Sequence, residues 1–331
     1  MTREGYRIAA PGAVEVLERC GVEGPVARLT ELAARTPGGL TVVIDSANGL
    51  LDAPLGAAGI PVLRADPPVP ADGGATAEEL AELGRTRAAT LTALPSAGWT
   101  MSGREEEIAA ADLASAPVER RLARCGRLVT GGFSTEPLVT LTFDDGPHPE
   151  YTPQVLDVLR RHDAPAAFFC IGLQALARPD VVRRIADAGQ TLGSHTWSHA
   201  YLPDLGPAGL ARQLGRTGEV LAEACGDDRP TRWLRPPYGG RSPELLRAVD
   251  ALGLITVLWD VDAKDWSRPG PATIAERVLD QVRPGSVILM HDGGGDRSQT
   301  VAALPAVITG LRERGYRLVG LDEALAAAPA A

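Results

Sequence analysis

Two adjacent carboxylates, Asp144 and Asp145, end an apolar run in the stretch LTFDDGPHPEYTPQVLDVLRRHDAPAAFFCIG, residues 141–172. Turn-forming residues follow them at once, in the sequence GPHP. Like charges in one site repel each other, so one of them usually shifts its pKa or meets a cation. The pair therefore predicts a cation site or a catalytic task where a buried strand ends.

The chain has five histidines, and His195 and His199 stand four residues apart in HTWSH. On one helical turn, positions i and i+4 share a face, so both imidazoles could reach one ion. The motif lacks the glutamate of the HExxH metalloprotease signature, and taken alone it also fits two ordinary core or surface histidines. Together with Asp145, however, the two histidines form a ligand set that leaves positions open for water, as catalytic hydrolytic metal sites do.

This ligand set suggests a division of tasks between the paired carboxylates. One carboxylate binds the metal ion, and its neighbour acts as the general base on the water that the ion activates. An acid is also needed for the leaving group, and His291, at a different predicted strand end, can supply the proton. The identity of the metal stays open, because several first-row ions accept two histidines and one aspartate.

Elements that could position these residues follow one another regularly from residue 137 onward. Helical patterns, with apolar residues recurring at three and four, alternate with seven strand-like runs: VTLTFDD, AAFFCIG, TLGSHTW, WLRPPYG, LITVLWDVD, SVILMHD and YRLVGLDE. Pro or Ser-Pro tends to begin the helices, and Gly tends to end them. Parallel strands need crossover connections, so this alternation predicts a parallel sheet.

Reactive side chains end five of the predicted strands. They are Asp144 and Asp145, His195 and His199, Arg235 and Tyr238, Asp262 and Asp265, and His291 and Asp292. Residues from so many strands meet at one face only if the strands form a ring, as they do at the carboxyl ends of barrel strands. We therefore expect an α/β fold with a distorted (β/α)7-type barrel, the alternative being an open doubly wound sheet.

Length and composition limit the remaining possibilities. The 331 residues suggest about two domains, which we place at residues 1–130, a smaller α/β accessory domain, and 131–331, the catalytic domain. A net charge of −9 argues against nucleic acid or an anionic membrane as a partner. No apolar stretch reaches the roughly 18 residues that span a bilayer, and no secretory signal is found, so a cytoplasmic location is expected. The four widely spaced cysteines are expected to be free thiols.

Five segments, TFDDGP, HTWSH, RPPYG, DAKDW and LMHD, carry a resemblance to a known family. In the order and spacing of these motifs, residues 137–325 resemble the polysaccharide deacetylases (NodB-homology, carbohydrate esterase family four). The resemblance implies that Asp144 is the catalytic base and that Arg235 orients it. It also implies that Asp145, His195 and His199 hold a divalent metal, usually zinc, with cobalt or another first-row ion also competent.

The same resemblance implies roles around the leaving group. His291 would protonate the departing amine, and Asp265 would orient His291. Tyr238 would supply a backbone N–H to the oxyanion and form one wall of the substrate groove, with Trp266 as the opposing wall. Leu289 would help to form the pocket for the acetyl methyl group.

Residues 1–130 contain a second, smaller α/β pattern. A strand, a turn and a helix are indicated by GLTVVIDSANG, and a second strand is indicated by IPVLRADPPV. A further helix and a third strand are indicated by GATAEELAELGRTRAATLTAL. These segments resemble the second domain of phosphohexomutases such as phosphoglucosamine mutase, although PSAGWTMSGR stands where that family has an Asp-rich metal loop. The resemblance implies a degenerate, non-catalytic unit serving stability, homo-oligomerisation or substrate presentation. No GxGxxG is present, so no dinucleotide is predicted.

Three functional hypotheses follow. The first is a metal-dependent hydrolase that removes the N-acetyl group from an amino sugar, an amino-sugar-containing metabolite or an oligosaccharide. The second keeps the same fold but places a non-sugar amide or cyclic amide in the site. The third is a non-catalytic binding or scaffold protein, which the intact metal and acid residues disfavour.

Overall fold

The apolar run that ends in the two carboxylates forms β7 (Leu138–Asp144), and all seven of its residues are buried. A strand without an exposed face needs partners on both sides, and β7 pairs in parallel with β8 (Ala166–Cys170) and β13 (Ser286–His291). Such continuous apolar runs are typical of parallel sheets covered on both faces. Our description comes from a computed structural model and covers residues 5–10, 13–18, 23–36, 40–44, 55, 57–64, 92–93, 105–226 and 231–328.

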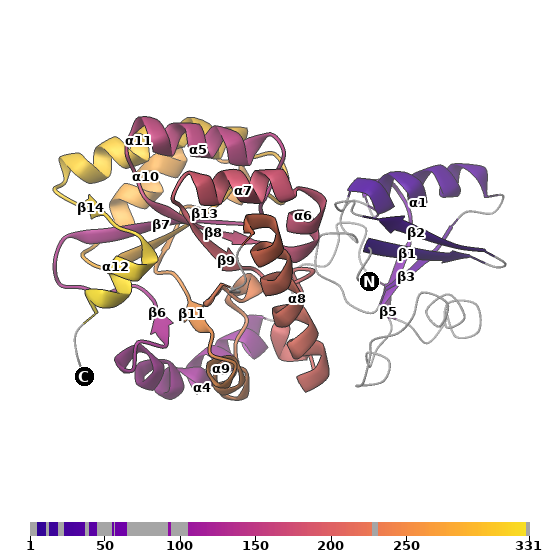
Figure 1. Cartoon of the computed structure of the whole chain (residues 1–331), viewed down its shortest axis with the longest axis horizontal. Coiled ribbons are helices and arrows are strands. Elements are labelled where there is room, and N and C mark those ends of the chain that lie inside the picture. The colour runs from indigo at the N-terminus through magenta and orange to yellow at the C-terminus, as the bar shows by residue number, and fades with distance from the viewer. Residues whose placement is uncertain are drawn as a thin grey trace.

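The larger part of the molecule is built around a curled sheet in which every strand pairing is parallel (Figure 1). Its path runs through β12 (Val261–Asp262), β13, β7, β8, β9 (Thr191–Ser194), β10 (Trp233–Leu234), β11 (Ile255–Val257) and β6 (Leu128–Val129), and β14 (Arg317–Leu318) pairs with the start of β7. The predicted strand LITVLWDVD splits into β11 and β12, which lie near opposite ends of this path. The three residues between them join the two ends, so the sheet curls into the expected (β/α)7-type barrel.

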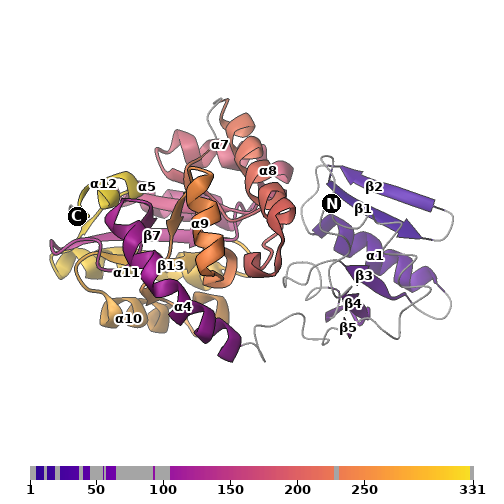
Figure 2. The same cartoon turned by 90° about the horizontal axis from the view of Figure 1, so that it is seen from below.

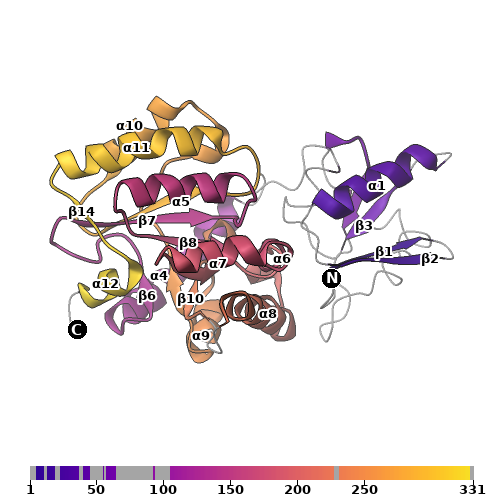
Figure 3. The ribbon, with the colours of Figure 1, turned by 45° about the horizontal axis from the view of Figure 1, so that its top comes forward.

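Helices cover the outside of the curled sheet. Figures 1 and 3 show α5, α10 and α11 on one side; α4 and α9 lie on the opposite side in Figure 1 and in front of the sheet in Figure 2. The helices of this part are α4 (Glu105–Arg124), α5 (Tyr151–Arg161), α6 (Gly172–Ala177), α7 (Pro179–Asp187), α8 (Pro207–Cys225), α9 (Pro243–Ala251), α10 (Pro271–Gln281), α11 (Ser298–Glu313) and α12 (Leu321–Ala326). Short 3-10 turns are η2 (Leu202–Asp204), η3 (Pro237–Gly239) and η4 (Asp265–Ser267).

Local signals in the sequence account for several helix boundaries. Proline occupies the first turn of α7, α8, α9 and α10, where its missing N–H has no intrahelical partner to lose. Ser242 caps α9 by accepting a hydrogen bond from the backbone N–H of Leu245. Gly226 ends α8 in the left-handed conformation, at φ 66°. The expected punctuation by Pro and Gly is therefore confirmed at these ends.

The N-terminal region contributes its own small elements. β1 (Gly5–Ala10) and β2 (Ala13–Glu18) form an antiparallel pair, followed by α1 (Glu23–Arg35). β3 (Val42–Ile44), β4 (Val62–Arg64) and β5 (Thr92–Ala93) form a second small sheet in that order. These three strands coincide with the predicted ones, whereas the helix predicted in GATAEELAEL lies outside the described residues. The phosphohexomutase resemblance stays a prediction.

An apolar cluster links this region to the barrel. Leu29, Leu55, Ile60 and Val62 are buried in one cluster with Tyr201, and Tyr238 packs against its edge. Further along the chain, α4 packs against α9 and β6 pairs with β11, so residues 105–129 contribute to the barrel. The boundary expected at residue 130 stays a prediction.

Two expectations from composition concern membranes and thiols. Within the described residues, no helix combines the length and the apolar character needed to cross a membrane. Cys125 and Cys170 are free thiols, as expected, and Cys20 lies outside the described residues.

Candidate active site

The carboxyl ends of the barrel strands bring the predicted polar residues together. Asp144 is the last residue of β7, and His291 is the last residue of β13. His195 and Arg235 come directly after β9 and β10. Because parallel strands all end at the same edge, four segments far apart in the sequence meet at one place.

Asp144 is held by a buried arginine. Oδ1 of Asp144 accepts a hydrogen bond of 2.8 Å from Nη1 of Arg235, and Oδ2 lies 3.6 Å from Nε2 of His195. Nη1 of Arg235 also donates to Oγ1 of Thr142, two residues earlier on β7. One oxygen of the Asp144 carboxylate is thus fixed by a cation, while the other faces His195, which follows β9, two strands away in the sheet.

Arg235 itself has no solvent exposure. Its remaining donors bond to the backbone oxygens of Val257 and Leu258, and its guanidinium lies 4.4 Å from the ring centre of Phe169. A buried charge of this kind is tolerated only when it is paired and fully hydrogen-bonded. The arrangement fixes Arg235 rigidly, and with it the orientation of Asp144.

Asp145, His195 and His199 form a compact set of potential metal ligands. Oδ1 of Asp145 lies 3.2 Å from Nε2 of His199 and 3.6 Å from Nε2 of His195. One ligand atom from each residue can be chosen so that all three lie within 4.8 Å of one another. Oδ1 of Asp145 is buried and has no hydrogen-bond partner among the residues that the structure describes, so it is an orphaned acceptor facing two ring nitrogens. A divalent cation at this place satisfies all three groups, so the residues fit a metal ion.

The charge state of Asp145 suits this task. Burial raises the pKa of the Asp145 carboxyl, but the positive charges of His199, His291, His195 and Arg297 outweigh it and lower the pKa to about 2. The group is therefore a carboxylate at neutral pH. An ionised carboxylate is the form that binds a cation.

Hydrogen bonds orient both imidazoles. Nδ1 of His195 lies 2.7 Å from the backbone oxygen of Arg235, which can only accept, so Nδ1 carries the proton and the Nε2 of the neutral ring keeps a free lone pair. Nδ1 of His199 lies 3.1 Å from the hydroxyl of Tyr238. Partners of this kind fix ring orientation and basicity in metal-binding histidines.

The HTWSH segment differs from the sequence-based expectation in its backbone. The two histidines do not share a helical turn, because β9 ends at Ser194 and the segment that follows is irregular. Thr196 and His199 adopt left-handed backbone conformations, at φ 67° and 58°. This folded loop, rather than a helix, brings the two ring centres to 4.8 Å.

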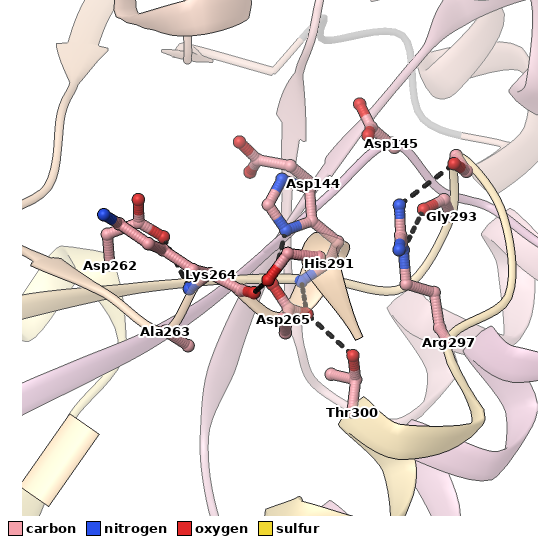
Figure 4. Close-up of polar contacts among 12 residues, drawn as sticks. Asp144, Asp145, Asp262, Ala263, Lys264, Asp265, His291, Gly293, Arg297 and Thr300 are labelled. Atoms are coloured by element: carbon pink, nitrogen blue, oxygen red, sulfur yellow. Dashed lines mark hydrogen bonds and ion pairs between the residues drawn. The ribbon is translucent and has the colours of Figure 1, made fainter. Parts of the chain in front are cut away.

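His291 and Asp265 form a second polar pair, at the end of β13 (Figure 4). Nδ1 of His291 lies 2.8 Å from Oδ1 of Asp265, while Oδ2 of Asp265 accepts from the backbone N–H of His291 and from Oγ1 of Thr300. Burial alone would lower the pKa of His291, but Asp265, followed by Asp145 and Asp144, outweighs it and raises the pKa to about 9. His291 is therefore protonated at neutral pH.

The residues expected to line the groove occupy different environments. Trp266, in η4 beside Asp265, is 55% exposed, which suits a wall open to solvent. Leu289 is buried and pairs in register with Asp262 on the neighbouring strand. Tyr238 sits in η3 with a left-handed backbone at φ 59°, and its hydroxyl is directed to His199.

Asp292 is a buried carboxyl rather than a simple turn residue. Its Oδ2 accepts a 2.5 Å hydrogen bond from Oγ1 of Thr152, and that hydroxyl in turn accepts from the backbone N–H of His148. Burial raises the pKa of Asp292 to about 7, with Asp145 and Asp144 adding to the effect. These hydrogen bonds connect the end of β13 to the first turn of α5.

Sequence reasoning missed three side chains that contact the predicted residues. Thr142 supports Arg235, Thr300 supports Asp265, and Arg297 lies against the loop beside Asp145. Thr300 and Arg297 lie outside the five motifs. Thr142 lies two residues before Asp144 on a buried strand, and a polar residue inside an otherwise apolar run was the available signal.

Comparisons with known proteins agree with this geometry. The sequence profile of the family described as Polysaccharide deacetylase matches residues 132–257. A chitooligosaccharide deacetylase of Sinorhizobium fredii is 42% identical over 207 residues, which are 60% of this chain and 96% of the relative. The match therefore covers nearly the whole length of that relative.

Solved structures add two similar chains. A peptidoglycan N-acetylglucosamine deacetylase matches with a TM-score of 0.60 and 33% identity, over 65% of this chain and all of the other. A CE4 family pseudoenzyme from Bacillus anthracis matches with a TM-score of 0.56 and 31% identity, over 60% of this chain and 68% of the other. Sequence, fold and site geometry agree, and the chain belongs to the polysaccharide deacetylase family.

Proposed function

We propose that this protein is a metal-dependent N-deacetylase that hydrolyses the N-acetyl group of an amino-sugar substrate. The observation that carries the proposal is that three sets of polar side chains lie close together at the carboxyl ends of the barrel strands. These are a carboxylate held by Arg235, a protonated His291 paired with Asp265, and the ligand set of Asp145, His195 and His199. Hydrolysis of an amide needs a base, an acid and a stabilised oxyanion, and these groups can supply all three.

Asp145, His195 and His199 would hold the metal ion, with zinc as the first candidate and cobalt or another first-row ion as an alternative. When bound, the ion supplies Lewis-acid polarisation and lowers the pKa of water at the site. The chain's own contribution is a carboxylate that stays ionised and two imidazoles whose Nε2 atoms are directed at it. The oriented tautomer of His195 makes its lone pair available without a proton rearrangement.

Asp144 is assigned as the general base. Its Oδ1 is occupied by Arg235, so Oδ2, on the side of His195, is the oxygen that can accept a proton from the attacking water. Arg235 is the residue that orients it, because a 2.8 Å bond to a fully buried guanidinium leaves the carboxylate little freedom. A fixed base close to the reacting water removes much of the entropic barrier to proton transfer.

His291 is assigned as the general acid that protonates the departing amine. Its raised pKa keeps the proton available at neutral pH, and Nδ1 is bonded to Asp265, so the proton to be donated is on Nε2. Asp265 orients the ring and stabilises its protonated form. An amine leaves far more readily after protonation, so this acid completes the reaction.

The groove residues keep the roles implied by the family. Trp266, exposed next to Asp265, would form one wall, Tyr238 the other wall and the backbone donor to the oxyanion, and Leu289 the pocket for the acetyl methyl group. An exposed indole suits a sugar ring, since sugars present apolar C–H faces that stack on aromatic surfaces. The exposed Trp266 therefore favours a sugar over a purely aliphatic amide.

The substrate class follows from the relatives and from the N-terminal region. Two of the relatives named above are deacetylases of chitooligosaccharides and of peptidoglycan N-acetylglucosamine, so we propose an N-acetylglucosamine-containing substrate. In this chain the N-terminal cluster packs on Tyr201 and Tyr238, beside the assigned groove wall. We propose that this accessory unit borders the groove and helps to set the length of substrate that the site accepts.

The test is acetate release from zinc- or cobalt-loaded protein supplied with N-acetylglucosamine, its phosphate and nucleotide forms, and chitooligosaccharides. Asp144→Asn is the inactive variant, and Asp262→Asn is its matched control, because Asp262 ends β12, two strands away from β7, but has no assigned role. Release that is lost in Asp144→Asn and kept in Asp262→Asn supports the proposal. If metal-loaded wild type releases acetate from none of these compounds, the sugar assignment is wrong, and amides without a sugar become the next panel. A folded chain inactive on both panels would match the pseudoenzyme relative.

A further inference from the structure

Arg297 is a buried cation that the roles assigned above leave unused. It stands directly before α11 and is 5% exposed, and in the described part of the chain no carboxylate forms an ion pair with it. Its guanidinium bonds to backbone oxygens instead: Nε donates to Gly293 (2.6 Å) and Nη2 to Gly294 (2.9 Å) (Figure 4). Burying a charge without an opposite partner costs free energy, so this position requires an explanation.

The loop held by Arg297 lies directly against Asp145. A Cβ added at Gly294, whose φ is +72°, would stand 2.5 Å from Oδ2 of Asp145, and one added at Gly293 would overlap the Asp145 backbone. The backbone N–H groups of Asp292 and Gly293 donate to the backbone oxygen of Asp144. The glycines therefore form a backbone surface on which the Asp145 carboxylate rests, and only residues without a side chain allow that approach.

Arg297 also acts on the site through its charge. Burial raises the pKa values of Asp145 and Asp265, and Arg297 is one of the cations that lower them. The same residue thus orders the loop beside one carboxylate and stabilises the ionised form of both.

Thr300 lies three residues further along, on the same face of the first turn of α11. Its Oγ1 donates a 2.7 Å hydrogen bond to Oδ2 of Asp265, and the side chain is fully buried. Oδ1 of Asp265 pairs with Nδ1 of His291. Figure 4 shows Arg297 beside Gly293, on the side of Asp145, and Thr300 beside Asp265.

We infer that the first turn of α11 is a common support for both halves of the site. Arg297 is a positioning residue that holds the loop of residues 293–295 against Asp145 and thereby fixes this carboxylate as a metal ligand. Thr300 is a positioning residue that fixes Asp265, and through it the acid His291. The inference rests on the roles proposed above for Asp145 and His291, and neither positioning residue contacts the reacting atoms.

The first experiment measures zinc affinity of the full-length protein by competition with a chromophoric chelator, with circular dichroism to verify folding. Arg297→Met is expected to bind zinc about 10–100-fold more weakly, the range typical for losing a partner that orients a ligand. Arg297→Lys keeps the charge but cannot bond two carbonyl oxygens at once, so a loss of about tenfold or more is also expected. Arg314→Met is the matched control, because Arg314 donates to Gly310 at the exposed far end of the same helix.

A glycine variant keeps the test decisive if Arg297→Met fails to fold. Gly294→Ala forces a methyl group toward the Asp145 carboxylate, whereas Gly189→Ala carries the same backbone strain, at φ +70°, with no atom of the described residues within 4 Å of the new Cβ. Weak zinc binding in Gly294→Ala with normal binding in Gly189→Ala supports the inference. Wild-type affinity, within about twofold, in folded Arg297→Met or in Gly294→Ala overturns it. Wild-type affinity in Arg297→Lys also overturns it, because charge alone would then be sufficient and the bonds to the loop would not be needed.

The second experiment addresses Thr300. Thr300→Val is nearly isosteric and removes only the donor, so kcat is expected to fall about 10–100-fold while zinc affinity and KM stay near wild type. Thr300→Ser restores the hydroxyl and should recover most of kcat. Equal defects in both variants would indicate a packing effect and overturn the role of Thr300. Because zinc affinity is measured without substrate, the Arg297 arm gives its answer even if the wild-type protein releases no acetate from any sugar.

Discussion

Nη1 of Arg235 lies 2.8 Å from Oδ1 of Asp144, and both side chains are almost completely shielded from water. The two residues are 91 positions apart, on the ends of two barrel strands that are not neighbours in the sheet. Their pairing crosses the interior of the curled sheet. It couples the stability of the barrel to the orientation of the proposed base.

Breaking this pair should destabilise the fold strongly. Arg235→Met leaves the Asp144 carboxylate buried without its cation, and removing one partner of a buried pair typically costs about 3–5 kcal/mol. The double variant Arg235→Met/Asp144→Asn removes both charges and should recover part of that loss. Urea unfolding monitored by circular dichroism measures both. A loss below about 1 kcal/mol in the single variant would show that the pair carries little stability.

Much of the fold was accessible from the sequence because the signals are local. Seven strand runs between amphipathic segments predicted the parallel barrel, and β7, with every residue buried, is the clearest case. The split of LITVLWDVD into β11 and β12 was not predicted. The run is continuously apolar, so its sequence does not indicate where the strand stops pairing with one neighbouring strand and begins to pair with another.

The site shows the same division between local and tertiary information. Asp144, Asp145 and His291 could be found because they end strands and stand next to turn residues. The loop conformation of HTWSH could not be predicted from the sequence, because the left-handed backbone at Thr196 and His199 depends on tertiary contacts rather than on residue type. Thr300 gave no signal, since a threonine in an amphipathic helix looks like any other surface or core position.

The pH dependence of kcat/KM should report on Asp265. His291 must be protonated to act, so activity is expected to fall as pH rises through its pKa, which is about 9 without a metal ion. A bound cation disfavours added positive charge nearby, so the alkaline limb is expected at or below pH 9. Asp265→Asn removes the main group that raises this pKa and should move the limb to lower pH while reducing the rate. The control Asp262→Asn should leave the limb in place, and an unmoved limb in Asp265→Asn would contradict the pairing.

Metal removal should lower both stability and activity. Treatment with a chelator is expected to lower the melting temperature and stop acetate release, and added zinc should reverse both. A ligand that binds only the folded state at a thousand times its Kd stabilises it by about 4 kcal/mol. His199→Gln should lose the zinc-dependent rise in melting temperature, because its Nε2 faces Asp145, whereas His162→Gln, outside the ligand set, should keep it. A zinc-dependent rise that survives in His199→Gln would place the metal elsewhere.

The accessory unit should influence which substrates are accepted. Leu55 is fully buried in the cluster that contains Tyr201 and borders Tyr238, so Leu55→Ala removes side-chain volume beneath the proposed groove wall. Cavities of this kind cost about 2–5 kcal/mol locally and loosen the residues around them. We therefore expect Leu55→Ala to change the ranking of kcat/KM across chitooligosaccharides of increasing length, while Leu113→Ala, at a position 78% exposed on α4, leaves it unchanged. If both variants rank the oligosaccharides as the wild type does, packing of the N-terminal unit against Tyr201 and Tyr238 does not shape the groove. In that case the N-terminal unit contributes to stability alone.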